Sequence, residues 1–265
     1  MPPRPFQSYC EDPYRVVRAA LALGAHYMDF ADGSDFVRGI GQFDEEARGR
    51  GFFVLSGVSS FPVLTAAVVR RLAQGFERVE TITAGIAPSP FAGVGLNVIR
   101  ATASYAGKPV RLTRGGAPAT GYALTETLRY TIAPPGYLPL RNTRFSLVDV
   151  PDLQLVPPQW PGLQSIWTGA GPVPEVLHRG LNLLATAVRL GLVPSLAPLA
   201  PVFHRAINPL TWGEHRADAC VRNVRIAPPR RLRSLSAGAD RARRVAQGSL
   251  SRRPPQQTDL LRALR

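Results

Sequence analysis

The sequence predicts an α/β protein that begins with a partial parallel sheet, continues as an α+β domain and ends in a disordered basic tail. Helical and extended patterns alternate over residues 13–76, and short apolar runs broken by proline and glycine follow over 79–216. Beyond Trp212 there is no Phe, Tyr or Trp. Alternating helices and strands are typical of parallel sheets with right-handed crossovers. We therefore expect three domains, 1–78, 79–216 and 217–265.

The first domain is expected to contain a helix, a strand, a helix, a strand and a helix in that order. Acidic residues begin the second helix and arginines end it, which matches the helix dipole. The second strand is followed by small residues, and ligands of open α/β sheets bind at the carboxyl ends of strands. The loop 56–62 is therefore the first candidate for a binding site. The expected helices are 13–24, 43–50 and 62–76, and the expected strands are 26–30 and 52–55.

The second domain mixes helices with short strands. Alternation of apolar and polar residues predicts a strand over 79–86, and helical spacing predicts a helix over 96–105. A glycine pair at 115–116 predicts a turn. Further strands are expected at 110–112, 147–153 and 165–168, and further helices at 176–190 and 195–206, the last interrupted by proline.

Most of the net positive charge of the chain lies near its carboxyl end. The formal net charge is +14, and residues 211–265 alone carry 13 basic and 4 acidic side chains, a net +9. Few apolar groups with high charge predict disorder. Such a tail could bind nucleic acid through its arginines. It has no interleaved aromatic residues for base stacking, so nucleic-acid binding is the less favoured interpretation.

Cysteine and histidine usage argues against disulfide and metal sites. Cys10 and Cys220 lie far apart and no CxxC motif occurs, so a reducing compartment, the cytoplasm, is expected. The histidines fall in separate predicted elements without metal-ligand spacing, and no metal is expected. The apolar stretch 181–203 contains Asn182, Arg189 and three prolines, which favours a buried or interfacial helix over a membrane span. Peripheral lipid contact and a homo-oligomer stay open as further expectations.

Several short motifs follow one another in a characteristic order. They are PFQ at 5–7, GAHYMDFADGS at 24–34, LSGVSSFP at 55–62, GIAP at 85–88, YAGKP at 105–109, DVPDL at 149–153 and LVPSLA at 192–197. Each motif alone has little specificity, and their order and spacing carry the specificity. Together, over about residues 5–216, they resemble the saccharopine dehydrogenase-like NAD(P)-dependent oxidoreductases.

The resemblance implies a Rossmann-type domain followed by a substrate domain, with NAD(P) as cofactor and a small molecule as substrate. The implied reaction is hydride transfer to or from an imine or carbonyl, which depends chiefly on positioning. The resemblance assigns no catalytic residue. The residues it places near the cofactor are Phe6, Asp32, Gly57, Ser59 and Ser60.

The same residues fit a purely structural interpretation equally well. Ser59 and Ser60 stand where a helix N-cap stands, and Asp32 with Gly33 suits an ordinary turn.

The chain departs from the family pattern at both ends. No GxGxxG turn occurs, although this turn binds the cofactor pyrophosphate, and Arg4 stands where the family has glycine. After about residue 216 the sheet-forming sequence expected of the family does not follow. We therefore expect a chain truncated at its amino end and divergent or frameshifted at its carboxyl end. Two interpretations remain, an oxidoreductase of this group and a non-catalytic remnant or out-of-frame fragment of it.

Overall fold

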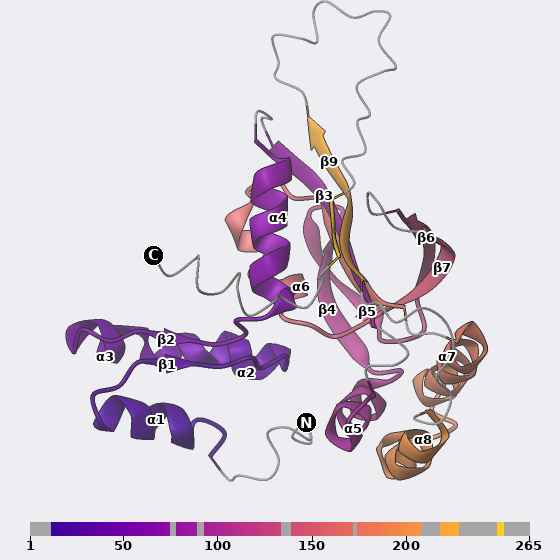
Figure 1. Cartoon of the computed structure of the whole chain (residues 1–265), viewed down its shortest axis with the longest axis horizontal. Helices are drawn as coiled ribbons and strands as arrows, with labels where there is room; N and C mark the ends of the chain where they lie inside the picture. The colour runs from indigo at the N-terminus through magenta and orange to yellow at the C-terminus, as the bar shows by residue number, and fades with distance from the viewer. Residues whose placement is uncertain are drawn as a thin grey trace, which may run out of the picture.

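A computed structural model describes residues 12–74, 78–88, 93–133, 139–171 and 174–207, and the backbone of 218–227 and 248–251 (Figure 1). The chain is an α/β protein with a small parallel pair of strands and a larger, curled mixed sheet. Figure 1 shows the small group at the lower left, beside the lower end of α4, and α5, α7 and α8 gathered at the lower right, below the large sheet.

The first group is built as the sequence predicts, with one additional helix. Strands β1 (Tyr27–Met28) and β2 (Val54–Leu55) pair in parallel. Helix α1 (Arg15–Ala22) buries Val17 and Leu21, four positions apart on one face, against Phe43 and Ala47. The remaining helices of this group are α2 (Ser34–Gly39), the 3₁₀ turn η1 (Ile40–Phe43) and α3 (Asp44–Gly49).

Six strands form the large sheet in the order β10-β9-β3-β8-β7-β6. Strands β3 and β8 are parallel, and all other neighbours are antiparallel. A separate antiparallel hairpin turns at Gly115 and Gly116, both with positive φ, as the glycine pair predicts. The sheet strands are β3 (Arg78–Ala87), β6 (Thr127–Ile132), β7 (Leu140–Leu147), β8 (Ser165–Ala170), β9 (Asp218–Ala227) and β10 (Gly248–Ser251), and the hairpin strands are β4 (Pro109–Arg114) and β5 (Ala117–Tyr122).

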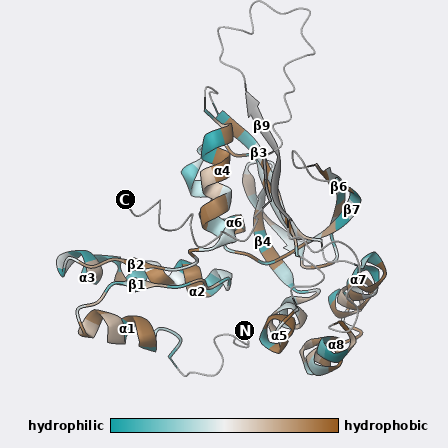
Figure 2. Cartoon of the chain, viewed as in Figure 1, coloured by the Kyte–Doolittle hydropathy of each residue, from teal (hydrophilic) through white to brown (hydrophobic). Residues whose placement is uncertain are grey.

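Helices cover the large sheet and build its core. Helix α4 (Thr65–Leu72), preceded by η2 (Ser60–Leu64), buries Val69 against Ile82 and Ile166. In Figure 2, α4 and α8 each carry hydrophobic and hydrophilic residues, as amphipathic helices do. The helices at the far end, which share a second core, are α5 (Leu96–Tyr105), α7 (Glu175–Arg189) and α8 (Ala200–Ile207), with η4 (Ala197–Leu199).

The prediction of a strand over 147–153 was wrong. Strand β7 ends at Leu147, and helix α6 (Asp152–Leu155) begins five residues later, followed by η3 (Pro157–Gln159). Pro151 stands at the N-cap with φ of −56°. Asp152 lies in the first turn, where the helix dipole favours an acidic residue. The apolar residues that suggested a strand are instead the buried face of a loop and a short helix.

Part of the predicted disordered tail is extended. Residues 218–227 form β9, which pairs antiparallel with β3, and residues 248–251 form β10 on the other side of β9. The edge of β3 offers a row of backbone donors and acceptors, which a short strand satisfies whatever its side-chain charge. The rest of the tail lies outside the described residues, and the division of the chain at 78/79 stays a prediction.

Candidate functional site

The loops after β1 and β2 lie together, where the sequence places its first candidate site. The amide of Asp29 donates to the carbonyl of Leu55 at 3.1 Å, and the amide of Val58 donates to the carbonyl of Asp29 at 2.9 Å. The loop after β2 therefore folds back over the end of β1. Because the two strands are parallel, both loops leave the sheet at the same edge.

The Asp29 carboxyl group braces the two loops. Its Oδ1 accepts hydrogen bonds from the amide of Ala31 (2.9 Å), the hydroxyl of Ser56 (2.7 Å) and the amide of Gly57 (3.0 Å). Three donors on one carboxylate oxygen make charge-assisted hydrogen bonds, which are stronger than neutral ones. Burial, together with the neighbouring Asp29 carboxylate, raises the pKa of Tyr27 to about 12. Asp29 lies in the GAHYMDFADGS motif, and the sequence alone did not indicate this role for it.

Gly57 is a structural necessity of this loop. Its φ is +71°, and a Cβ atom would lie 3.0 Å from Val37 Cγ1 and 3.3 Å from Pro62 Cδ. Any side chain would therefore be strained in its backbone and crowded by its neighbours. The predicted glycine thus lets the backbone pass close to α2.

Of the other residues predicted to lie near the cofactor, two lie in the loop after β2 and two lie elsewhere. Ser59 occupies the N-cap position of η2 but makes no capping bond, and its hydroxyl donates to the carbonyl of Phe61 at 3.3 Å. The carbonyl of Ser60 accepts from the Thr65 hydroxyl at 3.4 Å. Asp32 is exposed in the loop after β1, and Phe6 lies outside the described residues.

Two acidic residues from the second region reach this loop pair. The Ser34 hydroxyl, at the start of α2, donates to Asp149 Oδ1 at 2.7 Å, and both side chains are buried. This bond joins positions 115 residues apart and connects the first group to the segment before α6. Asp149 lies in the DVPDL motif, but its motif alone gave no sign of a partner in the first group. We define residues 29–34 and 56–62 with Asp149 and Asp152 as the junction cluster.

Asp152 is the unusual acid of the junction cluster. Its side chain is fully buried, and neither carboxyl oxygen has a hydrogen-bond partner within the part of the chain that the structure describes. Burial raises the pKa of Asp152 to about 7, while a weak interaction with the Thr65 hydroxyl acts in the opposite direction. A carboxyl group of this kind carries a proton for part of the time at neutral pH.

The junction cluster suits positioning more than covalent chemistry. It offers loop amides and serine hydroxyls that could hydrogen-bond a planar polar group such as a carboxamide, beside a buried acid that carries a proton for part of the time. Over the described residues no three His, Cys, Asp or Glu side chains gather as a metal site would require. The described helices include none that is both long and apolar enough to cross a membrane.

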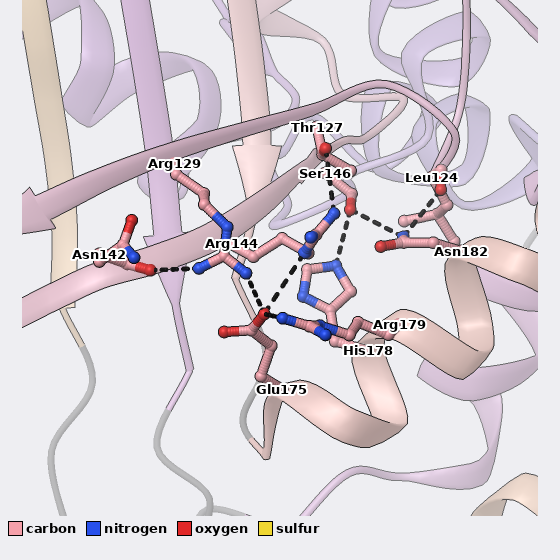
Figure 3. Close-up of polar contacts among 10 residues, drawn as sticks. All are labelled: Leu124, Thr127, Arg129, Asn142, Arg144, Ser146, Glu175, His178, Arg179 and Asn182. Carbon is pink, nitrogen blue, oxygen red and sulfur yellow. Dashed lines mark hydrogen bonds and ion pairs between the residues drawn. The ribbon is translucent and has the colours of Figure 1, made fainter.

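A second polar cluster lies between β6, β7 and α7, and Figure 3 shows it. Ser146 Oγ lies 2.7 Å from His178 Nε2, and Asn182 Nδ2 donates to Ser146 Oγ and to the carbonyl of Leu124, both at 2.8 Å. A Ser–His pair at this distance has the spacing of a nucleophile and its base. Ser146 is fully buried, however, and His178 Nδ1 has no partner within the described part of the chain, so no carboxylate orients the ring.

Comparisons with known proteins give similarity of fold to solved structures. No protein-family model matches the sequence, and no curated protein matches it. The fold is similar to the apo, histidine-tagged saccharopine dehydrogenase (L-Glu forming) from Saccharomyces cerevisiae, with a TM-score of 0.44 and 11% sequence identity. The similarity covers 78% of this chain and 62% of that chain, so it spans less than two thirds of the yeast enzyme. The case for a function therefore rests on the residues of this chain.

Proposed function

We propose that the protein is an NAD(P)-dependent oxidoreductase that transfers hydride to or from an imine or carbonyl of a small molecule. The junction cluster is the cofactor-facing part of its site. The observation that carries the proposal is the pair of loops at the carboxyl ends of the parallel strands β1 and β2, braced by Asp29. In open α/β sheets this edge is where nucleotides bind.

The residues of the cluster take distinct parts in this proposal. Gly57 lets the loop backbone pass close to α2 and so fixes the path of the loop that faces the nicotinamide. The hydroxyls of Ser59 and Ser60 and the exposed Asp32 orient the carboxamide or the substrate. Asp152 has no exposed surface, so it cannot contact a cofactor or substrate. It acts only through the residues that pack against it, by its own state of ionisation.

The second interpretation is a non-catalytic member of the same lineage. It is favoured by one observation: the hydroxyls of Ser56 and Ser59 already bond within the loops, as a purely structural arrangement requires. Under this interpretation the loops keep their hydrogen bonds but bind no dinucleotide.

Cofactor titration separates the two interpretations. The purified full chain is titrated with NADPH and with NADH while cofactor fluorescence and melting temperature are followed. Saturable binding that is lost in Asp29→Ala supports the proposal, because this substitution removes three bonds that hold the loops. Asp44→Ala is the matched control, since Asp44 lies exposed in α3 and pairs only with Arg48 among the interactions described. No binding of either cofactor would overturn the enzyme proposal in favour of the second interpretation.

A further inference from the structure

The cluster between β6, β7 and α7 contains more positively charged than negatively charged side chains. Glu175 Oε1 accepts from Arg179 Nε at 2.8 Å, pairs with Arg144 Nε at 3.6 Å and also accepts from Arg129 Nη2. Three guanidinium groups thus share a single carboxylate oxygen, which leaves an excess of two positive charges (Figure 3). We name Arg129, Arg144, Arg179, Glu175 and His178 the arginine cluster.

The two strand arginines of the cluster are held in place by bonds to the sheet. Arg129 Nη1 donates to the carbonyl of Asn142 at 2.7 Å, and Arg144 Nη1 donates to the Thr127 hydroxyl at 3.2 Å. Anchored guanidinium groups lose little freedom when they bind an anion, which favours binding. Arg144 Nε is buried and has no hydrogen bond within the described residues, since its contact with Glu175 is a longer ion pair.

The cluster has a solvent-accessible side and a buried floor. The exposed fractions of the arginine side chains are 23% for Arg144, 31% for Arg129 and 62% for Arg179. His178 beneath them is only 2% exposed. The guanidinium groups therefore meet solvent, whereas the histidine beside them does not.

The proton of His178 is assigned from its hydrogen-bond network. The Asn182 amide must direct its NH₂ toward the carbonyl of Leu124, and its second hydrogen is then donated to Ser146 Oγ. His178 Nε2, at 2.7 Å, is the remaining hydrogen-bond partner of Ser146 Oγ within the described residues, and we assign the hydroxyl hydrogen of Ser146 to that bond. In a neutral ring the proton is consequently on Nδ1. Burial, with Arg144 nearby, lowers the pKa of His178 to about 4, so the ring is neutral at neutral pH.

The Nδ1–H group is therefore a buried donor without an acceptor among the described residues. In Figure 3 this edge of the ring faces Glu175 and Arg144. Buried donors are almost always paired in folded proteins, and an unpaired one calls for an explanation. An acceptor that lies between the histidine and the arginines supplies that explanation.

We propose that the arginine cluster binds the oxyanion group, carboxylate or phosphate, of a small molecule. Arg129 and Arg144 hold the oxyanion in charge-assisted hydrogen bonds, and His178 Nδ1–H donates to it from below. Glu175 holds the three guanidinium groups together around its Oε1. The proposal is independent of NAD(P) binding, because these residues lie on β6, β7 and α7 and none belongs to the junction cluster.

A direct test on the wild-type chain follows the side-chain resonances of His178. Sodium phosphate and sodium glutarate are added in separate titrations at constant ionic strength, with sodium chloride as the reference salt. The chain has four histidines, and His178→Gln identifies the resonance by its loss. We expect the Nδ1 resonance to shift and saturate at millimolar anion with one or both probes. The titration that saturates identifies the oxyanion, and a resonance that follows ionic strength alone would overturn the site.

Binding to variants provides a second test. Calorimetry with the probe that binds should show about a tenfold weaker affinity or more for Arg129→Gln, because a charge-assisted bond is lost. Arg48→Gln is the matched control, since it removes an exposed arginine paired with Asp44 on the distant α3. Equal affinity in wild type and Arg129→Gln, or an equal loss in Arg48→Gln, would contradict the proposal. Circular dichroism of each variant establishes that it is folded, and if Arg129→Gln is not folded the resonance titration decides.

Discussion

The junction cluster and the arginine cluster each bury an ionisable group whose pKa is shifted toward the neutral form, an acid in the first and a base in the second. In the first, the acid Asp152 is surrounded by the ends of α4 and α6, and no cation compensates its charge. In the second, the base His178 lies beside Arg144 and Arg129, and only Glu175 opposes their charge. Both sites favour the neutral form, since desolvation penalises the charged form of either group.

This difference makes the two clusters respond to pH in opposite directions. Asp152 has a folded-state pKa above its ordinary 3.8, so its contribution to stability is full at low pH and is lost as the pH rises to about 7. His178 has a folded-state pKa below its ordinary 6.5, so its contribution is full above that value and is lost as the pH falls to about 4. Between these limits the two effects oppose each other and partly cancel in the intact chain.

Replacing Asp152 breaks this balance and has the largest expected effect. The rise of its pKa from 3.8 to about 7 corresponds to a loss of up to about 4 kcal/mol between about pH 4 and pH 8. Asp152→Asn removes this loss, so the stability of the variant should rise with pH where that of wild type is nearly flat. Urea unfolding at a series of pH values measures the change.

The outcome has a matched control on the surface. Asp44→Asn changes an acid that is 60% exposed and paired with Arg48 in α3, and it should leave the shape of the pH profile unchanged. Identical pH profiles for Asp152→Asn and wild type would show that Asp152 is ionised normally in the folded chain.

Replacing His178 removes the opposite pH dependence of stability, and the expected effect is slightly smaller. The lowering of its pKa from 6.5 to about 4 corresponds to about 3 kcal/mol, which wild type loses as the pH falls through this range. His178→Gln also weakens the bond to Ser146, but that cost is the same at every pH. At neutral pH the variant should therefore be less stable than wild type, and its stability should rise as the pH falls from about 7 to about 4, because the effect of Asp152 is no longer opposed. A pH profile as flat as that of wild type would rule out the proposed burial of a neutral imidazole.

How far the sequence predicts each cluster depends on the range of the contacts that build it. The loops of the junction cluster were predictable because each follows an apolar strand and consists of small residues near Gly57. The part played by Asp149 could not be predicted, because its bond to Ser34 joins two positions 115 residues apart. Periodicity describes neighbours along the chain and carries no information on such a pairing.

The arginine cluster could not be predicted for a related reason. Arg129, Arg144 and Arg179 lie on three elements whose pairing depends on the register of β6 with β7. From the sequence, His178 was only one of four histidines in separate predicted elements, and its bond through Nε2 to Ser146 was not predicted. A sequence signal was present, since Glu175, His178, Arg179 and Asn182 share helical spacing on one face of α7.

Predictions for helices held better than those for strands. The predicted helix over 96–105 coincides with α5, and the predicted helix over 176–190 differs from α7 by one residue at each end. The strand predicted over 147–153 failed because Asp149 and Asp152 are buried through contacts with other parts of the chain. The apolar residues of this segment are buried because they belong to a loop and a short helix, and they did not indicate an extended backbone.

The smallest predicted effect concerns the bond that connects the junction cluster to the rest of the chain. Ser34→Ala deprives the buried Asp149 carboxyl of a donor at 2.7 Å, which should lower the free energy of unfolding by about 2 kcal/mol. Ser104→Ala is the control, because its hydroxyl donates only to a carbonyl one turn away in α5 and its loss should change stability by less than about 0.5 kcal/mol. If both variants lose equally little, Ser34 and Asp149 do not hold the two regions together. If Ser34→Ala loses the larger amount and also weakens NADPH binding, the same bond both stabilises the chain and positions the loops.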